Sequence, residues 1–264
     1  MRTLLALLLL TVPLAAHADP RIIPAERIRE VHVVAKGGEL SVNAVTNRVV
    51  EVDLSDPDAK VEELDGVLWV RFAKGYSELR IPLRATLTVE AEKLSPEIAG
   101  RYQRLEVRVA TGDVTLTVES AETVVAVARG NVSSSGMSNR LRILVSHGDV
   151  ELMGMADEAR VEAPEGEVRV ERPPRVLEVI GGTGLVTLDG RFESKSKASV
   201  QTTSGNVVVT AGGVDGIRAA ISSESGAISV PDAAPQKSKA TFVRGKGGTE
   251  IRVATVSGSV RVED

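Results

Sequence analysis

The stretch Gly112-Asp113-Val114-Thr115-Leu116 decides the fold, because versions of it return along the chain. It reappears as Gly130-Asn131-Val132-Ser133-Ser134 and as Gly148-Asp149-Val150-Glu151-Leu152. Further copies begin at Gly166, Gly184, Gly205, Gly226 and Gly258. The first five glycines are 18 residues apart, the next two steps are 21 residues, and the last gap is 32 residues. A recurring unit of this length indicates a repeat architecture.

Within each copy, apolar and polar residues alternate. The position two residues after glycine is always β-branched, and the position four residues after it is aliphatic except at Ser134. The residue between them is mostly polar, so each copy predicts a short strand with one buried face. The two columns expected to face the core are Val114, Val132, Val150, Val168, Val186, Val207, Ile228, Val260 and Leu116, Ser134, Leu152, Val170, Leu188, Val209, Val230, Val262.

Each repeat also contains a second predicted strand. These strands are Val124–Ala128, Leu141–Val145, Arg160–Glu162, Val176–Ile180, Ser199–Gln201, Ile217–Ile221 and Ala240–Val243. One coil cannot bury its own apolar face, so neighbouring coils must stack. The fold class is therefore all-β: a single-chain parallel β-solenoid with two or three strands in each coil of about 18–21 residues. The last gap holds one more candidate rung at Gly248-Thr249-Glu250-Ile251-Arg252-Val253, slightly out of register.

The recurring glycines are expected at the corners between strands. A corner needs a left-handed or otherwise strained backbone, which glycine adopts without a Cβ penalty. Asp and Asn after the glycine tolerate that region and cap turns with their side chains.

Residues 19–111 are also rich in strand patterns, but less regular. The predicted strands are Val31–Val34, Glu39–Val42, Val49–Leu54, Val67–Phe72, Glu78–Pro82, Thr86–Ala91 and Leu105–Ala110. Asp56-Pro57-Asp58 and Asp65-Gly66 are turn signals, and Ser95-Pro96-Glu97 predicts a short helical turn or a loop. No polar linker separates this part from residues 112–264, so residues 19–264 are expected to form one continuous β-structure.

Residues 1–18 have the pattern of a signal peptide. Arg2 precedes an apolar stretch from Leu4 to Leu14, and Ala16-His17-Ala18 supplies small residues for cleavage. We therefore expect export, to the periplasm or outside the cell, and a mature chain of formal charge about −5 without Arg2. The chain has no cysteine, no basic stripe for nucleic acid and no other apolar run long enough for a transmembrane helix.

The order of these motifs resembles a known family. Gly38-Glu39-Leu40-Ser41-Val42 comes first, then Leu79-Arg80-Ile81-Pro82 with Ala85-Thr86-Leu87-Thr88-Val89, then the glycine rungs. This order is similar to the bacterial putative-adhesin family of β-strand repeat domains of unknown function. The resemblance covers nearly the whole mature chain and implies an exported β-solenoid. It implies no catalytic residues.

Several residues could have either a binding or catalytic role or a purely structural one. Asp113, Asn131, Asp149 and Glu167 would stack at one corner, as calcium ligands or, as we expect, as turn residues. Gly181-Gly182-Thr183-Gly184 lacks the lysine of a phosphate loop and is expected to be a corner. The remaining candidates are His32 and His147, which are expected to be structural or exposed, Trp69 and Tyr76 for sugar stacking or packing, and the strand carboxylates Glu151, Glu162 and Glu178.

None of these residues forms a recognisable catalytic, cofactor or metal set, so no site residue and no cofactor is predicted. The favoured hypothesis is a non-catalytic, adhesin-like binding or scaffold protein of the cell envelope, with an envelope polysaccharide or an envelope protein as partner. The alternative is a polysaccharide-active lyase or glycosidase on a β-helix. Self-association is a third hypothesis, because Val260-Arg261-Val262 would leave an open strand edge guarded by Glu263 and Asp264.

Overall fold

The computed structural model describes residues 20–210, 216–245 and 248–263, and the signal-peptide prediction and Asp264 lie outside them. One 3-10 turn, η1 (Ala25–Arg27), accompanies twenty strands in these ranges. The strands are β1 (Arg21–Pro24), β2 (Glu30–Val45), β3 (Val49–Leu54), β4 (Lys60–Leu64), β5 (Val67–Phe72), β6 (Tyr76–Pro82), β7 (Thr86–Thr111), β8 (Val114–Arg129), β9 (Val132–His147), β10 (Val150–Leu152), β11 (Met155–Ala163), β12 (Val168–Val170), β13 (Val176–Gly181), β14 (Val186–Leu188), β15 (Lys197–Thr202), β16 (Val207–Thr210), β17 (Gly216–Ser229), β18 (Gln236–Gly245), β19 (Thr249–Thr255) and β20 (Val260–Glu263).

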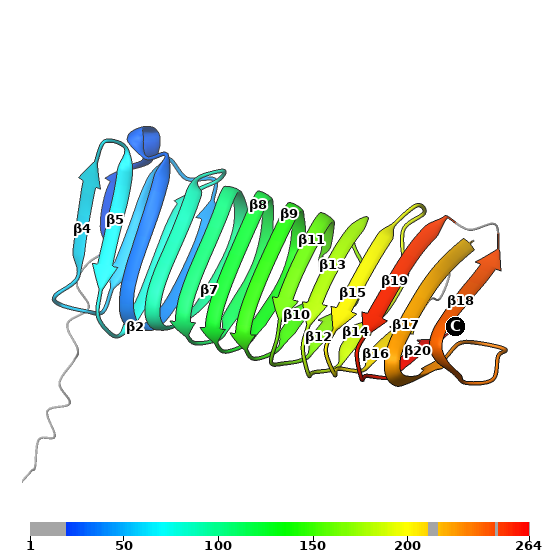
Figure 1. The fold of residues 1–264 in the computed structure, drawn as a ribbon. Coiled ribbons are helices and arrows are strands. Elements are labelled where there is room, and N and C mark those ends of the chain that lie inside the picture. The colour runs from blue at the N-terminus through cyan, green and yellow to red at the C-terminus, as the bar shows by residue number, and fades with distance from the viewer. Residues whose placement is uncertain (1–19, 211–215, 246–247, 264) are drawn as a thin grey trace, which may run out of the picture.

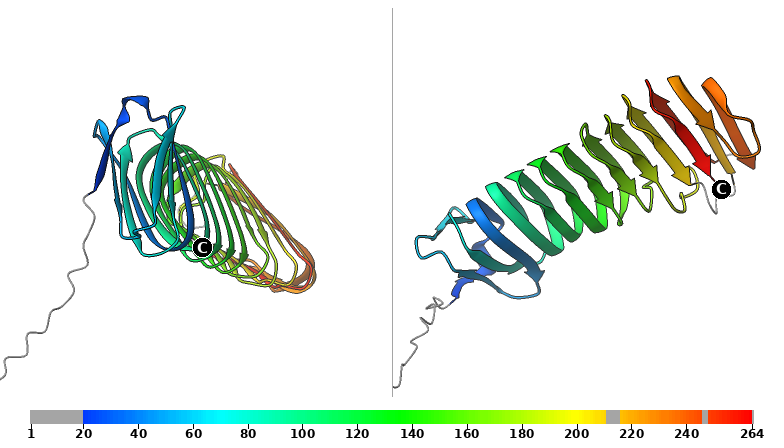
Figure 2. Two further views of the ribbon diagram at one scale, coloured as in Figure 1. Left: turned by 90° about the vertical axis from the view of Figure 1, so that its left-hand side faces the viewer. Right: turned by 90° about the horizontal axis from the view of Figure 1, so that it is seen from below.

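The strands wind into a flattened rod with two faces (Figures 1 and 2). We call one the long face; it contains the second half of β8 and β9, then β11, β13 and β15. The other, the rung face, contains the first half of β8 and β9, then β10, β12, β14 and β16. Neighbouring coils pair in parallel at a register of 18 residues, as at Val114 and Val132. The predicted parallel β-solenoid is confirmed: each regular coil crosses both faces, as one bent strand in β8 and β9 and as two separate strands from β10 onward.

The core lies between the two faces and consists of stacked aliphatic columns. The predicted rung column is buried, with Val132, Val150 and Val168 each 1% exposed. From the long face, Val107, Ile143 and Val161 meet it and are fully buried. Because small β-branched side chains fill these thin layers, few aromatic residues are needed.

The glycines form one edge of the rod, which we call the glycine edge. Gly112, Gly130, Gly148 and Gly166 have φ between 136° and 153°, as the left-handed prediction requires. Gly184, Gly205, Gly226 and Gly258 are not left-handed, yet a Cβ at any of them would overlap the carbonyl oxygen of the glycine in the adjacent coil. Close stacking of the corners is therefore the requirement that all eight share.

The first coils are closed by antiparallel strands. β4 pairs antiparallel with β5, and β1 and β3 continue the rung face beyond β6 in antiparallel pairs. The β4–β5 hairpin turns at Asp65 and Gly66, both with positive φ, as a two-residue hairpin with right-handed twist requires. The short strands β1 and β4 were not predicted from the sequence.

The prediction of a helical turn or loop at Ser95-Pro96-Glu97 is wrong. These residues lie inside β7, where the chain enters the rung face. Pro96 pairs with Leu40 of β2, but pairing with β8 begins only at the next residue, Glu97 with Thr115, so a residue without an N–H is tolerated on the side toward β8.

The coils at the other end do not stack in sequence order. β19 pairs with β15 on one side and β17 on the other, and β20 lies between β16 and β17 (Figure 1). The coil of residues 249–263 is thus inserted between the coil of residues 197–210 and the coil of residues 216–229. The stacking order of the glycines is accordingly Gly205, Gly258, Gly226.

Two predictions are corrected by this insertion. The segment after Gly248 is not an additional rung, because β19 lies on the long face. Val260 and Arg261 are paired on both sides, so the last rung is not an open edge. The outermost strand is β18, which folds back antiparallel on β17 and carries the exposed residues Lys237 and Lys239. Lysines on an edge strand oppose pairing with another chain.

Candidate functional site

The polar residues of the glycine edge form a hydrogen-bond ladder along the rod. The side-chain Oδ1 of Asp113 accepts the backbone N–H of Asn131 at 2.8 Å, and Oδ1 of Asn131 accepts that of Asp149 at 2.9 Å. Oδ1 of Asp149 accepts the N–H of Glu167 at 2.8 Å. These oxygens satisfy corner N–H groups in the adjacent coil, so the ladder has a structural role. None of its four residues has a positive φ, so their tolerance of the left-handed region is not used here.

The other residues considered from the sequence are also held in structural contacts. His147 Nδ1 lies 2.6 Å from Glu165 at the surface, and His32 Nε2 lies 2.7 Å from Glu30. Gly182 is a corner whose carbonyl accepts three backbone N–H groups. The structure does not bring the two histidines together with one another.

Trp69 lies on the outer side of the long face near the first coils. Its ring is 4.4 Å from that of His32, and the Arg71 guanidinium lies 4.9 Å over it. Both contacts cover the ring, so the Trp69 side chain serves in packing and is not free to stack on a sugar. Tyr76 is 46% exposed on the rung face, away from this cluster.

The strand carboxylates belong to ion networks. Arg160 binds Glu162 and Glu178, each at 2.8 Å, on the long face, and hydrogen bonding to Glu162 raises the pKa of Arg160 above its usual range. Glu151 lies on the rung face, in a different part of the surface. The two long-face carboxylates therefore share one guanidinium instead of facing an empty cleft.

A groove that the sequence did not indicate lies on the edge opposite the glycines, which we call the far edge. The first regular rungs extend over seven residues, as in Val114–Ser120, but β10, β12 and β14 have only three each. The chain then leaves the rung face early and crosses the far edge in loops. These loops enclose an open groove of about 280 Å³, lined by Met155, Ala156, Glu171, Arg172, Pro173, Pro174, Gly190, Arg191 and Glu193.

One wall of the groove is the insertion that lengthens a coil from 18 to 21 residues. It spans residues 189–196 and is anchored by Phe192, which is 2% exposed. The Glu193 carbonyl accepts hydrogen bonds from Ser196 Oγ at 2.6 Å and Thr249 Oγ1 at 3.0 Å. The wall is therefore fixed before any partner arrives, which reduces the entropy lost on binding.

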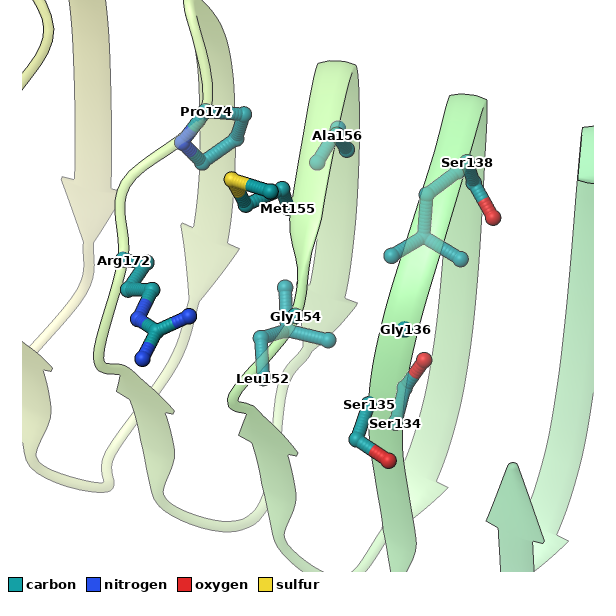
Figure 3. A pocket seen from close by; sticks show the side chains of 12 residues that line it. Ser134, Ser135, Gly136, Ser138, Leu152, Gly154, Met155, Ala156, Arg172 and Pro174 are labelled. Atoms are coloured by element: carbon teal, nitrogen blue, oxygen red, sulfur yellow. The ribbon is translucent and has the colours of Figure 1, made fainter. Parts of the chain in front are cut away.

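A small cavity lies under the groove, where the rung column changes size. Ser134 stands in the inward column between Leu116 and Leu152, and it lines the cavity with Ser138, Leu141 and Leu152. Met155 and Pro174 also line the cavity, and Figure 3 shows the Met155 side chain beside Pro174. The cavity of about 10 Å³ has room for about one water molecule.

The arginines of the groove differ from most arginines on the two faces. On the faces, Arg101, Arg108 and Arg160 form ion pairs with glutamates of adjacent coils. Arg172 and Arg191 are exposed, and the ion pairs found among the described residues include neither. The groove therefore combines a floor of proline, alanine and methionine with two guanidinium groups that form no ion pair with any described residue, and the carboxylates of Glu171 and Glu193 also line it.

A second hollow, of about 480 Å³, lies on the long face, but it is shallow. It is lined by alanines such as Ala110 and Ala126, and its rim contains Arg108 and Glu90. These two charges are paired at 3.1 Å. Because these two rim charges already pair with each other, the hollow is less suited to bind a charged partner than the groove of the far edge.

Two other features, a metal-binding cluster and a membrane-spanning helix, are absent from the part of the chain that the structure describes. In residues 20–210, 216–245 and 248–263, no three His, Asp or Glu side chains are arranged to hold a metal ion. In the same ranges, no helix is long and apolar enough to cross a membrane.

Together, these features define a capped parallel β-solenoid with a preformed edge groove. The chain belongs to the Toastrack DUF4097 family, whose model matches residues 22–263. The resemblance drawn from the rungs is thus confirmed, and the family is one of unknown function.

Two solved structures are similar to the chain. One is a putative adhesin from Bacteroides fragilis, 11% identical with a TM-score of 0.43, covering 92% of this chain and 95% of that one. The other is a putative cell adhesion protein from Clostridium sporogenes, 9% identical with a TM-score of 0.25, covering 93% of this chain and 99% of that one. No curated protein matches the chain in sequence.

Proposed function

We propose that this protein is an exported, non-catalytic binding scaffold of the cell envelope, and that the far-edge groove holds an extended polypeptide segment of its partner. The observation that carries the proposal is the pair of exposed arginines, Arg172 and Arg191, which form no ion pair within the described part of the chain and lie above the apolar floor of a preformed groove. Export rests on the signal-peptide pattern of residues 1–18.

The chemistry of the groove favours a polypeptide with an acidic group beside an aliphatic side chain. Pro173, Pro174 and Ala156 offer apolar contact, and the guanidinium groups match a carboxylate. Among the described residues, no aromatic side chain lines the groove, whereas sugar rings are commonly held by stacking on aromatic side chains. A polysaccharide partner is therefore the less favoured occupant.

A scaffold role is also supported by the use made of the carboxylates. Glycoside hydrolysis needs two carboxyl groups on either side of the substrate bond. On the long face, Glu162 and Glu178 are instead joined by Arg160, and on the glycine edge Asp113 and Asp149 accept backbone N–H groups. These residues serve the rod itself.

The test is retention of purified residues 19–264 on separated envelope fractions: proteins, peptidoglycan and surface polysaccharide. We expect saturable retention on the protein fraction, and its loss in the double variant Arg172→Glu/Arg191→Glu. The matched control is Arg48→Glu/Arg129→Glu, which makes the same charge change at exposed arginines away from the groove and should retain binding. Retention on polysaccharide alone, or equal loss in both double variants, would contradict the proposal.

A further inference from the structure

The methionines of this chain are concentrated on one small part of the far edge. The sequence has four methionines, one of them Met1, and the others are Met137, Met153 and Met155. These three are 52%, 37% and 47% exposed. Methionine is among the residues most often buried in folded proteins, so three exposed methionines in one place require an explanation.

The register of the coils makes the three side chains neighbours. Met155 of β11 pairs with Met137 of β9 in parallel strands, so their Cα atoms are about 5 Å apart and their side chains leave the same side. Met153 precedes Met155 by two residues, and its N–H donates to the Ser134 carbonyl at 2.9 Å. Three thioether groups therefore project from two consecutive coils.

Met155 lines the groove and the cavity beneath it, but packing does not account for Met137 and Met153. In the column of Met153, the preceding coils carry Thr117 and Ser135, and in the column of Met137 they carry Arg101 and Glu119. The methionines thus occupy outward positions where the regular coils have polar residues. The core makes no demand for an apolar side chain there.

We propose that Met137, Met153 and Met155 form a binding site for a soft monovalent metal ion, Cu(I). Thioether sulfur is a soft ligand that selects Cu(I) over the harder divalent ions. The chain contains no cysteine, so these sulfur atoms are its only soft ligands besides that of Met1. The nearest column neighbour with a carboxylate, Glu119, is held by Arg101 at 2.6 Å, which leaves the thioethers as the available donors.

The side chains have the freedom that binding requires. Met155 extends toward Pro174 of the next coil in Figure 3, and about half of it is exposed. Methionine has three rotatable side-chain bonds and a polarizable sulfur. Rotation of Met155 toward Met137 would bring these two sulfur atoms together, because the two residues are register partners in adjacent strands.

The experiment is an anaerobic titration of purified residues 19–264 with Cu(I) in competition with a chromophoric Cu(I) chelator. We expect one equivalent bound, at least about tenfold weaker binding for Met137→Leu or Met153→Leu, and no binding for the triple leucine variant. Leucine approximately conserves volume, so these variants should keep the fold, which thermal unfolding checks. The control His32→Gln/His147→Gln should bind as the parent does.

Three results would overturn the site: no competition with the chelator, undiminished binding by the triple variant, or loss of binding in the histidine control. Met155 belongs to both the proposed metal site and the groove, but a variant that leaves Met155 unchanged separates the two proposals. Met137 and Met153 do not line the groove, so Met137→Leu/Met153→Leu should still retain the protein partner.

Discussion

At the scale of single residues, the glycine corners set the limit on what the repeat tolerates. Gly148 combines a φ of 137° with a position directly against the Gly130 carbonyl oxygen. A side chain there meets backbone, which cannot move without displacing the adjacent coil. Gly248 differs, because the nearest atom to its added Cβ is 3.8 Å away and its φ is not left-handed.

These two glycines give a matched pair of substitutions. Gly148→Ala should lower the free energy of unfolding by at least about 2 kcal/mol, since it adds both backbone strain and overlap. Gly248→Ala should change it by less than about 0.5 kcal/mol. Chemical denaturation measures both, and an equal effect of the two substitutions would be inconsistent with close stacking at the corners.

Asp56 gives a second prediction at this scale, one that depends on pH. The side chain is 4% exposed and accepts the N–H of Ala73 at 2.7 Å, with weaker bonds from Asp58 and Lys74. The Ala73 hydrogen bond lowers the pKa of Asp56 below its ordinary value of 3.8, against the opposing effect of burial. The ionised form is therefore favoured by folding, and its contribution is present above about pH 4.

As the pH falls through the lowered pKa, Asp56 becomes protonated and that contribution is lost. The parent should be more stable than Asp56→Asn at pH 7, and the difference should shrink below pH 4. Unfolding midpoints of the two proteins between pH 2 and pH 7 provide the measurement. A difference that stays constant over this range would show that the charge of Asp56 does not matter.

At the scale of elements, the rung strands show how one small residue changes a coil. Ser134 replaces the usual leucine or valine in the inward column, beside the cavity under the groove. Ser134→Val should fill this space and raise stability by about 0.5–1 kcal/mol, as cavity-filling substitutions commonly do. Ser133→Val, one residue earlier on the outward side, is the control and should have little effect. Thermal unfolding of both variants tests this, and a loss of stability in Ser134→Val would mean that the cavity cannot accept the added methyl groups.

Most strands could be predicted from the sequence, except those that depend on pairing with a neighbouring strand and lack a pattern of their own. β3 and β5 begin and end where the alternation of apolar residues placed them, because each pattern is contained in its own segment. β1 and β4 lack a regular alternation and become strands by pairing with stronger neighbours, so propensity alone did not show them. The far-edge groove was missed for a related reason: it depends on where three short rungs stop, and no single residue marks that point.

At the scale of the whole molecule, the inserted coil changes the meaning of a truncation. A chain ending at Gly245 lacks β19 and β20, which separate β15 and β16 from β17. Residues 216–245 then lose the strands on which they stack. We expect limited proteolysis to remove residues 216–245 quickly while residues 20–210 stay protected.

A coil stack in sequence order would behave differently. There, the same truncation would remove only an outer coil, and residues 216–245 would remain protected. Hydrogen exchange of the truncated and full chains distinguishes the two arrangements. Full protection of residues 216–245 in the truncated chain would rule out a required insertion.

The insertion also fixes an order of assembly during synthesis. Coils up to β16 can stack as they emerge from the ribosome or a translocation channel, since each follows the coil on which it packs. Residues 216–245 are made before residues 249–263, yet they find their proper neighbours only afterwards. Their polypeptide must therefore wait unpaired, or pair provisionally with β15 and be displaced. An incomplete chain would thus carry unpaired strands in its last third, and these strands would be accessible to cellular proteases.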